Sequence, residues 1–258
     1  MKVYYKTEDE IALMRESADL LGRAHAEVAK NIKEGVSLKQ LDKIAEQFIK
    51  DHGANPSFLN YGGFPASLCM SLNDVVVHGI PNNYELKDGD VISIDCGVYL
   101  NGFHSDSAYT YPVGNVAPEV MKLLKVTQEC LTLGIQQAKL NNHIEDIGYT
   151  VQKYAETHGY GVVRELVGHG LGRDLHEKPE VPNYGKKGRG LKIKDGLVIA
   201  IEPMINLGTR GIVQDADGWT IRTRDGKPSA HYEHTVAIHN GETEVLTTFK
   251  YIEEVYKF

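Results

Sequence analysis

The chain of 258 residues has only three cysteines, at positions 69, 96 and 130, and none of them forms a Cys-x-x-Cys pair. An odd number of unclustered cysteines argues for reduced thiols and against a structural zinc site. The chain also lacks any apolar stretch near the ~20 residues that a membrane span needs, and its first residues lack the apolar core of a secretory signal. We therefore expect a cytoplasmic protein without a membrane partner.

The chain has no strong excess of positive charge and no flexible linker. Its formal net charge of −7 makes it a poor non-specific binder of nucleic acid, so we expect no specific nucleic-acid partner. One basic stretch, at residues 186–194, is more typical of a solvated loop. No stretch rich in Pro, Gly or Ser interrupts the chain, and we expect residues 1–258 to form a single domain around one core.

A turn and a strand occur twice, about a hundred residues apart. Residues 87–95 read KDGDVISID and residues 194–202 read KDGLVIAIE, so each copy ends an apolar run on a carboxylate. A single apolar strand that ends on an acid is common, but the same turn, strand and acid in both parts of the chain is not. The repeat indicates two pseudo-symmetric halves, about 1–115 and 116–258, that meet at a shared site.

The repeat extends to the helices. Residues 37–53 begin with a Ser-x-x-Gln capping box and have apolar side chains at helical spacing, and residues 144–159 repeat that stripe. Each is preceded by a longer helical stretch, at 8–33 and at 118–139. We expect an α+β fold in which the helices cover the outer face of an antiparallel, pseudo-twofold sheet.

The first pair of acids lies on either side of a predicted hairpin. The dipeptide Asn-Gly at 101–102 favours a two-residue turn, which places Asp95 opposite Ala108 and Gly97 opposite Asp106. The two aspartates are then diagonal neighbours on one face, roughly 7 to 8 Å apart at the backbone. A three-residue turn would send one of them to the other face, so the prediction depends on the turn type.

The second half supplies two more acids. Glu202 precedes Pro203, which holds it extended at the end of a strand, and Glu233 lies within a strand. Each acid alone is well explained by an ion pair with a lysine or arginine. If the halves superpose, however, Asp95 and Glu202 become counterparts, as do Asp106 and Glu233. Four carboxylates would then repel one another unless cations neutralise them, so we predict two divalent metal ions.

Histidines are the other candidate ligands for such ions. His169 and His176 lie in a glycine-rich loop, where His169 can supply a single imidazole ligand and His176 can contact substrate. Either could instead be an ordinary buried polar residue. His104 and His231 alternate with the acids Asp106 and Glu233, which favours an orienting or packing role over metal binding.

The predicted donor set points to hydrolytic chemistry. Carboxylates with one imidazole and no thiolate suit Mn, Fe(II) or Co better than a closed zinc site, although zinc stays open. Two such ions can activate a water and polarise a carbonyl, which is a route to amide hydrolysis. The His-Glu-x-x-His motif of zinc proteases and the Glu-x-x-His motif of di-iron bundles are both absent.

At this point a family resemblance is evident, in order and spacing, over nearly the whole chain. The chain resembles the type I methionine aminopeptidases of metallopeptidase family M24 through HGIP (78–81), ID (94–95) with Asp106, GHGLG (168–172) with His176, IEPM (201–204) and YEHT (232–235). The resemblance implies the pita-bread fold of the creatinase and aminopeptidase group. It also implies removal of the initiator methionine from new polypeptides when the next residue is small.

The resemblance assigns roles to individual residues. Asp106 and Glu233 would bridge two divalent ions, which could be Co, Mn, Fe(II), Zn or Ni, and the full ligand set would be Asp95, Asp106, His169, Glu202 and Glu233. Glu202 would also act as the proton shuttle. His176 would hydrogen-bond the carbonyl oxygen as it becomes an oxyanion, and His78 would hold the scissile amide nitrogen.

The resemblance also implies an apolar pocket for the methionine side chain. Its lining would be Tyr61, Phe64, Cys69, His78, His176 and Trp219, with Phe58 and Leu175 at the edges. Phe58 stands where a small cysteine is frequent in the family, and Leu175 where a phenylalanine is frequent, so the pocket shape should differ. From composition alone, these aromatic residues could equally be part of the core.

A monovalent cation site, for Na or K, is implied by Asn73, Val75 and Ser229. Structural capping explains Asn73 and Ser229 equally well. The chain has neither a Cys-rich N-terminal extension nor a helical insertion between Glu202 and Glu233, which indicates a compact, bacterial-type enzyme.

The expected partners are the N-termini of nascent polypeptides, with the ribosome as a candidate partner. Because both halves of the site come from one chain, we expect a monomer. Two rival functions remain at this stage. One is an Xaa-Pro aminopeptidase or dipeptidase of the same fold, although these usually have a large extra N-terminal domain. The other is a non-catalytic binding protein, which would be expected to have lost metal ligands.

Overall fold

The helices begin at the capping signals that the sequence contains. In the computed structural model, which describes residues 2–257, the Ser37 hydroxyl accepts a hydrogen bond from the Gln40 N–H, and the Gln40 side chain accepts one from the Ser37 N–H. Thr7 and Glu10 form the same reciprocal cap. The helices are α1 (Glu8–Ala29), α2 (Leu38–Asp51), α3 (Pro118–Ile135), α4 (Ile144–Thr157) and α5 (Lys250–Val255), with a short 3₁₀ turn at Tyr61–Gly63.

The shorter pair of predicted helices is confirmed by α2 and α4, whereas the longer pair ends earlier than expected. Helix α1 stops at Ala29 instead of residue 33, and α3 stops at Ile135 instead of residue 139. After α1 the chain turns back towards the sheet. Gly35 adopts a left-handed φ of 81° there and donates its N–H to the carbonyl of Leu86, which a continuing helix could not do.

The strands pair in antiparallel ladders, as predicted. They form four sheets, in the orders β1-β4-β2 with β5 on β4, β13-β10-β6, β11-β12-β3, and β15-β14-β9-β7-β8. The strands are β1 (Asn55–Pro56), β2 (Leu68–Leu72), β3 (Val75–Val77), β4 (Val91–Leu100), β5 (Phe103–Pro112), β6 (Gly161–Val162), β7 (Gly168–Gly170), β8 (Glu177–Val181), β9 (Leu197–Ile201), β10 (Met204–Asn206), β11 (Ile212–Gln214), β12 (Ile221–Thr223), β13 (Ser229–His231), β14 (His234–His239) and β15 (Glu242–Val245).

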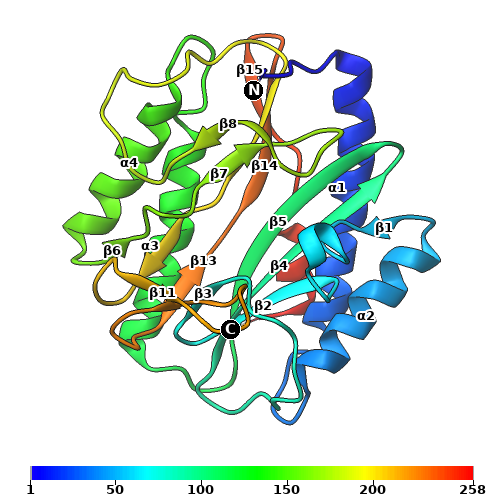
Figure 1. The fold of residues 1–258 in the computed structure, drawn as a ribbon, viewed down its shortest axis with the longest axis vertical. Coiled ribbons are helices and arrows are strands. Elements are labelled where there is room, and N and C mark those ends of the chain that lie inside the picture. Colours follow the sequence, from blue (N-terminus) through cyan, green and yellow to red (C-terminus); the bar gives the residue numbers. More distant parts are fainter. Residues whose placement is uncertain (1, 258) are drawn as a thin grey trace.

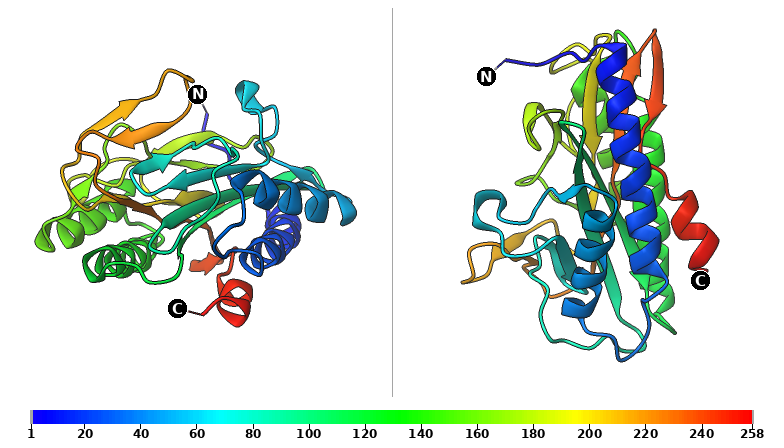
Figure 2. Two further views of the ribbon diagram at one scale, coloured as in Figure 1. Left: turned by 90° about the horizontal axis from the view of Figure 1, so that it is seen from below. Right: turned by 90° about the vertical axis from the view of Figure 1, so that its right-hand side faces the viewer.

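The four long helices lie on one side of the strands. Figure 2 shows α1 and α2 together under one half of the strand layer and α3 and α4 under the other. The main core lies between the helices and strands, where Leu21, Leu41 and Leu123 share one buried cluster with Ile94 and Ile199. Within residues 2–257, none of the helices is both long enough and apolar enough to cross a membrane.

The two halves of the chain join where β5 runs beside β13 and β14 (Figure 1). The Glu233 N–H donates to the Ala108 carbonyl at 2.9 Å, and the Ser107 hydroxyl donates to the Glu233 carbonyl at 3.0 Å. The Asp106 N–H in turn donates to the Thr235 hydroxyl at 3.2 Å. This junction therefore brings Asp106 from the first half and Glu233 from the second side by side.

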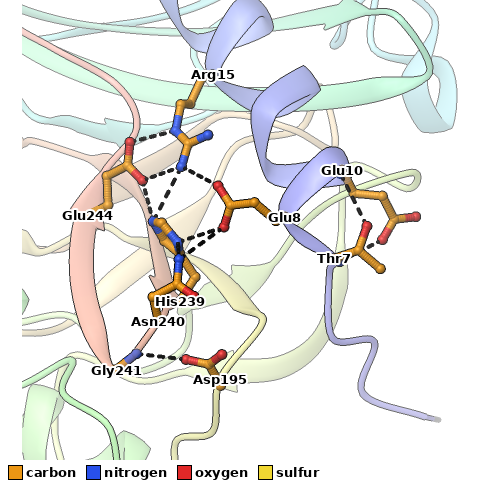
Figure 3. A network of polar contacts seen from close by, with 9 residues as sticks. All are labelled: Thr7, Glu8, Glu10, Arg15, Asp195, His239, Asn240, Gly241 and Glu244. Carbon is orange, nitrogen blue, oxygen red and sulfur yellow. Dashed lines mark hydrogen bonds and ion pairs between the residues drawn. The ribbon is translucent and has the colours of Figure 1, made fainter.

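A second link ties the start of α1 to the last hairpin, as Figure 3 shows. The Arg15 guanidinium binds both carboxylate oxygens of Glu244, at 2.7 and 2.9 Å, and also reaches Glu8 at 3.1 Å. His239 lies between Glu8 and Glu244. Because these side chains are partly exposed, the network fixes the geometry of the hairpin more than it adds stability.

Burial of His25 in α1 makes the stability of the fold depend on pH. The ring is 2% exposed, its Nε2 lies 2.9 Å from the Ser107 carbonyl, and its Nδ1 has no hydrogen-bond partner among residues 2–257. This burial lowers the pKa of His25 from 6.5 to about 4. The unfolded chain therefore binds a proton here before the folded chain does, so stability falls as the pH drops below 6.5.

We predict that a His25→Gln variant, which keeps a donor but does not titrate, loses this part of the pH dependence. Between about pH 7 and pH 5 the free energy of unfolding of the unmodified protein should fall by about 2 kcal/mol more than that of the variant. Urea unfolding at both pH values measures the difference, and the exposed His52→Gln variant is the control. An equal fall in the free energy of unfolding of the unmodified protein and of His25→Gln between these pH values would contradict the prediction.

Candidate metal centre and substrate cavity

The β4–β5 hairpin has the register that the sequence predicts. Asn101 and Gly102 both adopt positive φ angles, of 53° and 85°, so the strands join through a two-residue turn. Asp95 pairs with Ala108 and Gly97 with Asp106. The two aspartates consequently lie on one face of the hairpin, and both line the same cavity.

The second half brings its acids and its histidine to the same cavity. Glu202 follows the last residue of β9, and Glu233 lies between β13 and β14. His169, in β7, has its Nε2 atom 3.6 Å from Glu202 Oε1 and 3.9 Å from Asp106 Oδ2. Ligand atoms of Asp106, His169 and Glu233 all lie within 4.8 Å of one another, which is close enough for them to share a metal ion.

The orientation of the His169 ring suits a metal ligand. Its Nδ1 atom lies 2.9 Å from the Gly170 carbonyl, and this contact assigns the ring proton to Nδ1. Burial lowers the pKa of His169 to about 3, so the ring is neutral. The lone pair of Nε2 therefore faces the carboxylates and is free to bind a cation.

In the described part of the chain the four carboxylates lack lysine or arginine partners, and Asp106 and Glu233 are buried whereas Asp95 and Glu202 are partly buried. Burial raises the pKa of Asp95 to about 7, and burial together with neighbouring acids raises the pKa values of Asp106, Glu202 and Glu233 well above their usual range. Within residues 2–257, no lysine or arginine forms an ion pair with any of them. Buried charges of this kind need compensation from paired charges or metals.

Three of the carboxylate oxygen atoms have neither a hydrogen bond nor an ion pair among residues 2–257. Asp95 Oδ1, Asp106 Oδ1 and Glu233 Oε1 are buried and have no hydrogen-bond partner in the described part of the chain. Four carboxylates and one neutral imidazole form an oxygen-rich set of hard ligands without a thiolate. The residues present therefore fit divalent metal ions.

The predicted substrate-contact residues line the same cavity, which has a volume of about 620 Å³ including the part open to solvent. Phe58, Phe64, Cys69 and Leu175 form one apolar cluster, and Trp219 packs against it. The remaining lining residues are Tyr61, His78, Asp95, Asp106, His169, His176, Glu202 and Glu233. An apolar wall thus lies directly beside the acidic cluster.

The two histidines assigned to substrate also face this cavity. The Nδ1 atom of His176 lies 2.7 Å from the Tyr61 hydroxyl, and the centre of the His176 ring lies 4.2 Å from that of the His169 ring, with the two planes tilted by 59°. His78 has a positive φ of 59°, which is unusual for a residue other than glycine, and its ring approaches that of Trp219. Burial lowers the pKa values of both histidines, His78 to about 4.

Phe58 fits the cavity wall because a glycine lies beneath it. A Cβ atom at Gly97 would lie 3.0 Å from the Phe58 ring and 2.7 Å from Ser57 Cβ, so a larger residue at position 97 would displace both. Gly97 is also the register partner of Asp106. The wall of the cavity and the position of a predicted ligand thus depend on the same point of the hairpin.

The residues of the expected monovalent cation site lie together but are already hydrogen-bonded. The Asn73 side chain donates to Asp90 and accepts from the Val91 N–H, and its carbonyl accepts from the Ser229 N–H. The Ser229 hydroxyl donates to the side chain of Asn206. These contacts favour the capping alternative for both side chains, and cation binding near Val75 stays a prediction.

His231 is closer to the candidate centre than the sequence suggested. Its ring is buried, and its Nε2 atom lies 3.7 Å from Glu202 Oε2 without a hydrogen-bond partner among residues 2–257. The two-residue spacing between His231 and Glu233 was the available signal. His104, by contrast, contacts the Ser57 hydroxyl at 2.8 Å and does not line the cavity.

The amino-acid sequence is similar to those of known metallopeptidases. Residues 12–240 match the model of metallopeptidase family M24. The chain is 51% identical to a methionine aminopeptidase of Clostridium perfringens over 96% of this chain and 100% of that protein. It is also 51% identical to methionine aminopeptidase 1 of Bacillus subtilis, over 94% and 98% of the two chains.

Solved structures give the same result. The crystal structure of methionine aminopeptidase from Rickettsia prowazekii matches with a TM-score of 0.94 and 40% identity, over 96% of this chain and 100% of that one. The prolidase from Pyrococcus horikoshii matches with a TM-score of 0.77, but at 21% identity and over 63% of its length, which shows the fold alone. The predicted pita-bread fold is confirmed.

We predict that an Asp106→Asn variant has two opposite effects on stability. Without metal, removal of one buried carboxylate relieves repulsion, so the variant should melt at or above the temperature of the unmodified protein in EDTA. With Mn²⁺ the unmodified protein should gain about 2.7 kcal/mol at a free metal concentration of a hundred times Kd, and the variant much less.

Thermal melts with EDTA and with Mn²⁺ at neutral pH measure both effects. Glu242→Gln, at an exposed acid of β15, is the control and should respond to metal as the unmodified protein does. Equal metal stabilisation of Asp106→Asn and the unmodified protein would exclude Asp106 as a ligand.

Proposed function

Because the chain belongs to metallopeptidase family M24, we propose that its acidic cluster holds two divalent metal ions. The protein is a metal-dependent aminopeptidase that removes N-terminal methionine, as the motifs predicted. The observation that supports the two-metal site is the group of four buried or partly buried carboxylates around the neutral His169, with no lysine or arginine paired to them in the described part of the chain.

In this proposal Asp95, Asp106, His169, Glu202 and Glu233 would hold the ions, and Asp106 and Glu233 would serve both. Bound ions would neutralise the carboxylates and would supply the Lewis acidity that binds an α-amino group and activates water. The junction of the two halves places Asp106 and Glu233 side by side, which suits ligands that serve both ions.

The protein side chains then orient the substrate and move the proton. Glu202 accepts the proton of the attacking water and passes it to the leaving amine. His176 donates through Nε2 to the carbonyl oxygen, because its Nδ1 is held by the Tyr61 hydroxyl. His78, at the cavity wall, hydrogen-bonds the scissile amide nitrogen.

The apolar wall of the cavity would receive the methionine side chain. Phe58, Phe64, Cys69, Leu175 and Trp219 offer an apolar surface that suits an unbranched thioether. Tyr61 stands 43% exposed at the edge of the cavity and is positioned to limit the size of the residue after methionine. We propose that this second residue is small.

The setting of the reaction follows from its substrate. We propose that the enzyme acts as a monomer in the cytoplasm on nascent polypeptide N-termini, with the ribosome as a partner, and that residues 1–258 form one catalytic domain. The oxygen-rich ligand set favours Mn, Fe(II) or Co as the metal, with Zn and Ni as the other candidates.

We predict that metal-reconstituted protein cleaves Met-Ala-Ser much faster than Leu-Ala-Ser or Ala-Pro peptides. The Leu side chain branches where the apolar wall receives a linear chain, which should lower kcat/KM by about tenfold to a hundredfold. Chromatography of the released amino acid, with added Mn²⁺, Co²⁺ or Fe²⁺, measures the rates. Fast cleavage of Ala-Pro with none of Met-Ala-Ser would identify a proline-specific enzyme instead.

We predict that His176→Ala lowers turnover far more than metal affinity. Loss of one hydrogen-bond donor to the oxyanion should reduce kcat by about a hundredfold to a thousandfold. Calorimetric titration with Mn²⁺ should give an affinity close to that of the unmodified protein, because His176 is not a ligand in this scheme. Unchanged turnover together with lost metal would assign His176 to the metal instead.

A further inference from the structure

A buried ion pair joins the N-terminal segment to the loop that contains His176. Lys6 Nζ lies 2.6 Å from Glu177 Oε2, and each side chain is only 4% exposed. In every other ion pair of a lysine or arginine among residues 2–257, both side chains are at least 28% exposed. This pair is therefore of a different kind from the surface pairs.

The two oxygen atoms of Glu177 have separate partners. Oε2 accepts from Lys6, whereas Oε1 accepts from the Asp174 N–H at 3.4 Å. The second contact closes the turn 174–177, in which Leu175 and His176 are the central residues. The carboxylate that pairs with Lys6 thus also fixes the shape of the turn that presents His176.

The loop backbone lies directly against the ion pair. A Cβ atom at Gly172 would lie 2.5 Å from Lys6 Cε and 2.8 Å from Glu177 Oε1, so only glycine leaves room for the pair. The Gly172 carbonyl accepts from the His104 N–H at 2.8 Å, which ties the loop to β5. The loop is consequently held between β5 and the buried pair.

The N-terminal segment is itself anchored. The Lys6 N–H donates to the Gly196 carbonyl at 2.7 Å, and Thr7 caps α1 immediately afterwards. Val3 forms an isolated bridge with Lys178, next to Glu177, where the segment passes β8 (Figure 1). Lys6 therefore has a fixed backbone position from which its side chain reaches the turn.

Desolvation of two charges makes a buried ion pair no better for stability than apolar residues of the same volume. Geometry offers a better reason for this pair. We propose that Lys6 and Glu177 are positioning residues, which hold His176 against the substrate carbonyl and Leu175 in the wall of the cavity. This inference rests on the proposed role of His176.

The first test is the Lys6→Met variant, loaded with Mn²⁺ and assayed on Met-Ala-Ser. A displaced turn should lower kcat and kcat/KM together by between about tenfold and a hundredfold, while the number of bound metal ions is unchanged. Lys6→Arg should keep most of the activity. Arg173→Met, which removes an exposed ion pair between the same loop and Glu10, is the matched control and should leave kcat unchanged.

A double-variant cycle separates positioning from a general loss of stability. If the effect runs through His176, Lys6→Met should lower turnover by less than about twofold in a His176→Ala background. Amide hydrogen exchange of residues 172–177 should be faster in Lys6→Met than in the unmodified protein, and this measurement does not depend on catalysis. The proposal would be overturned if the effects of Lys6→Met and His176→Ala on turnover multiply in the double variant. An unchanged kcat of Lys6→Met below its melting temperature would also overturn it.

Two further outcomes are distinguishable. Unchanged turnover in His176→Ala would reject the proposed role of His176, whereas hydrogen exchange would still test whether Lys6 holds the turn. Should Lys6→Met fail to fold, Lys6→Met with Glu177→Leu removes both charges and should fold, yet it lacks the acceptor for the Asp174 N–H. Low turnover of this folded double variant would support positioning, and full turnover would overturn it.

Discussion

The gathering of four buried or partly buried carboxylates at the junction of the two halves is the constraint on which the site depends. Asp106 and Glu233 come from segments that are far apart in the chain, and hydrogen bonds between β5 and the β13–β14 region hold them together. Their neighbours in the cavity are acids, histidines, Tyr61 and apolar groups, and no lysine or arginine from the described part of the chain lines it. Bound cations would neutralise this cluster, so in the proposed function the chemistry of the site and the association of the halves have a common cause.

Much of this arrangement follows from local signals in the sequence. The Asn-Gly turn determined the register of β4 and β5, and with it the placement of Asp95 and Asp106 on one face. The capping box at Ser37 correctly located the start of α2. These predictions succeeded because turn and cap geometries involve residues only a few positions apart, where the chain has few alternatives.

Other features depend on contacts between distant segments, which no local pattern reports. The Lys6–Glu177 pair joins residues 171 positions apart. The approach of His231 to Glu202 depends on the pairing of β13 with β10, in which Met204 lies opposite His231. The position of Phe58 depends on Gly97, because a Cβ atom there would crowd the Phe58 ring and Ser57. The chain after α1 and α3 also bonds to distant segments, because the Gly35 N–H donates to the Leu86 carbonyl and the Asn141 N–H donates to the Ile193 carbonyl. The repeat and the hairpin register predicted the four acids as metal ligands, whereas the family resemblance supplied the roles of His78 and of the residues in the cavity wall.

The junction has a consequence for the lifetime of the protein. Because the proposed ligands come from both halves, release of the ions would leave like charges facing each other across the same hydrogen bonds that join those halves. Metal binding would therefore stabilise the contact between the halves. In a cell depleted of metal, the protein would be less stable and would be degraded by proteases more easily. Metal supply would then regulate how much enzyme persists as well as how fast it works.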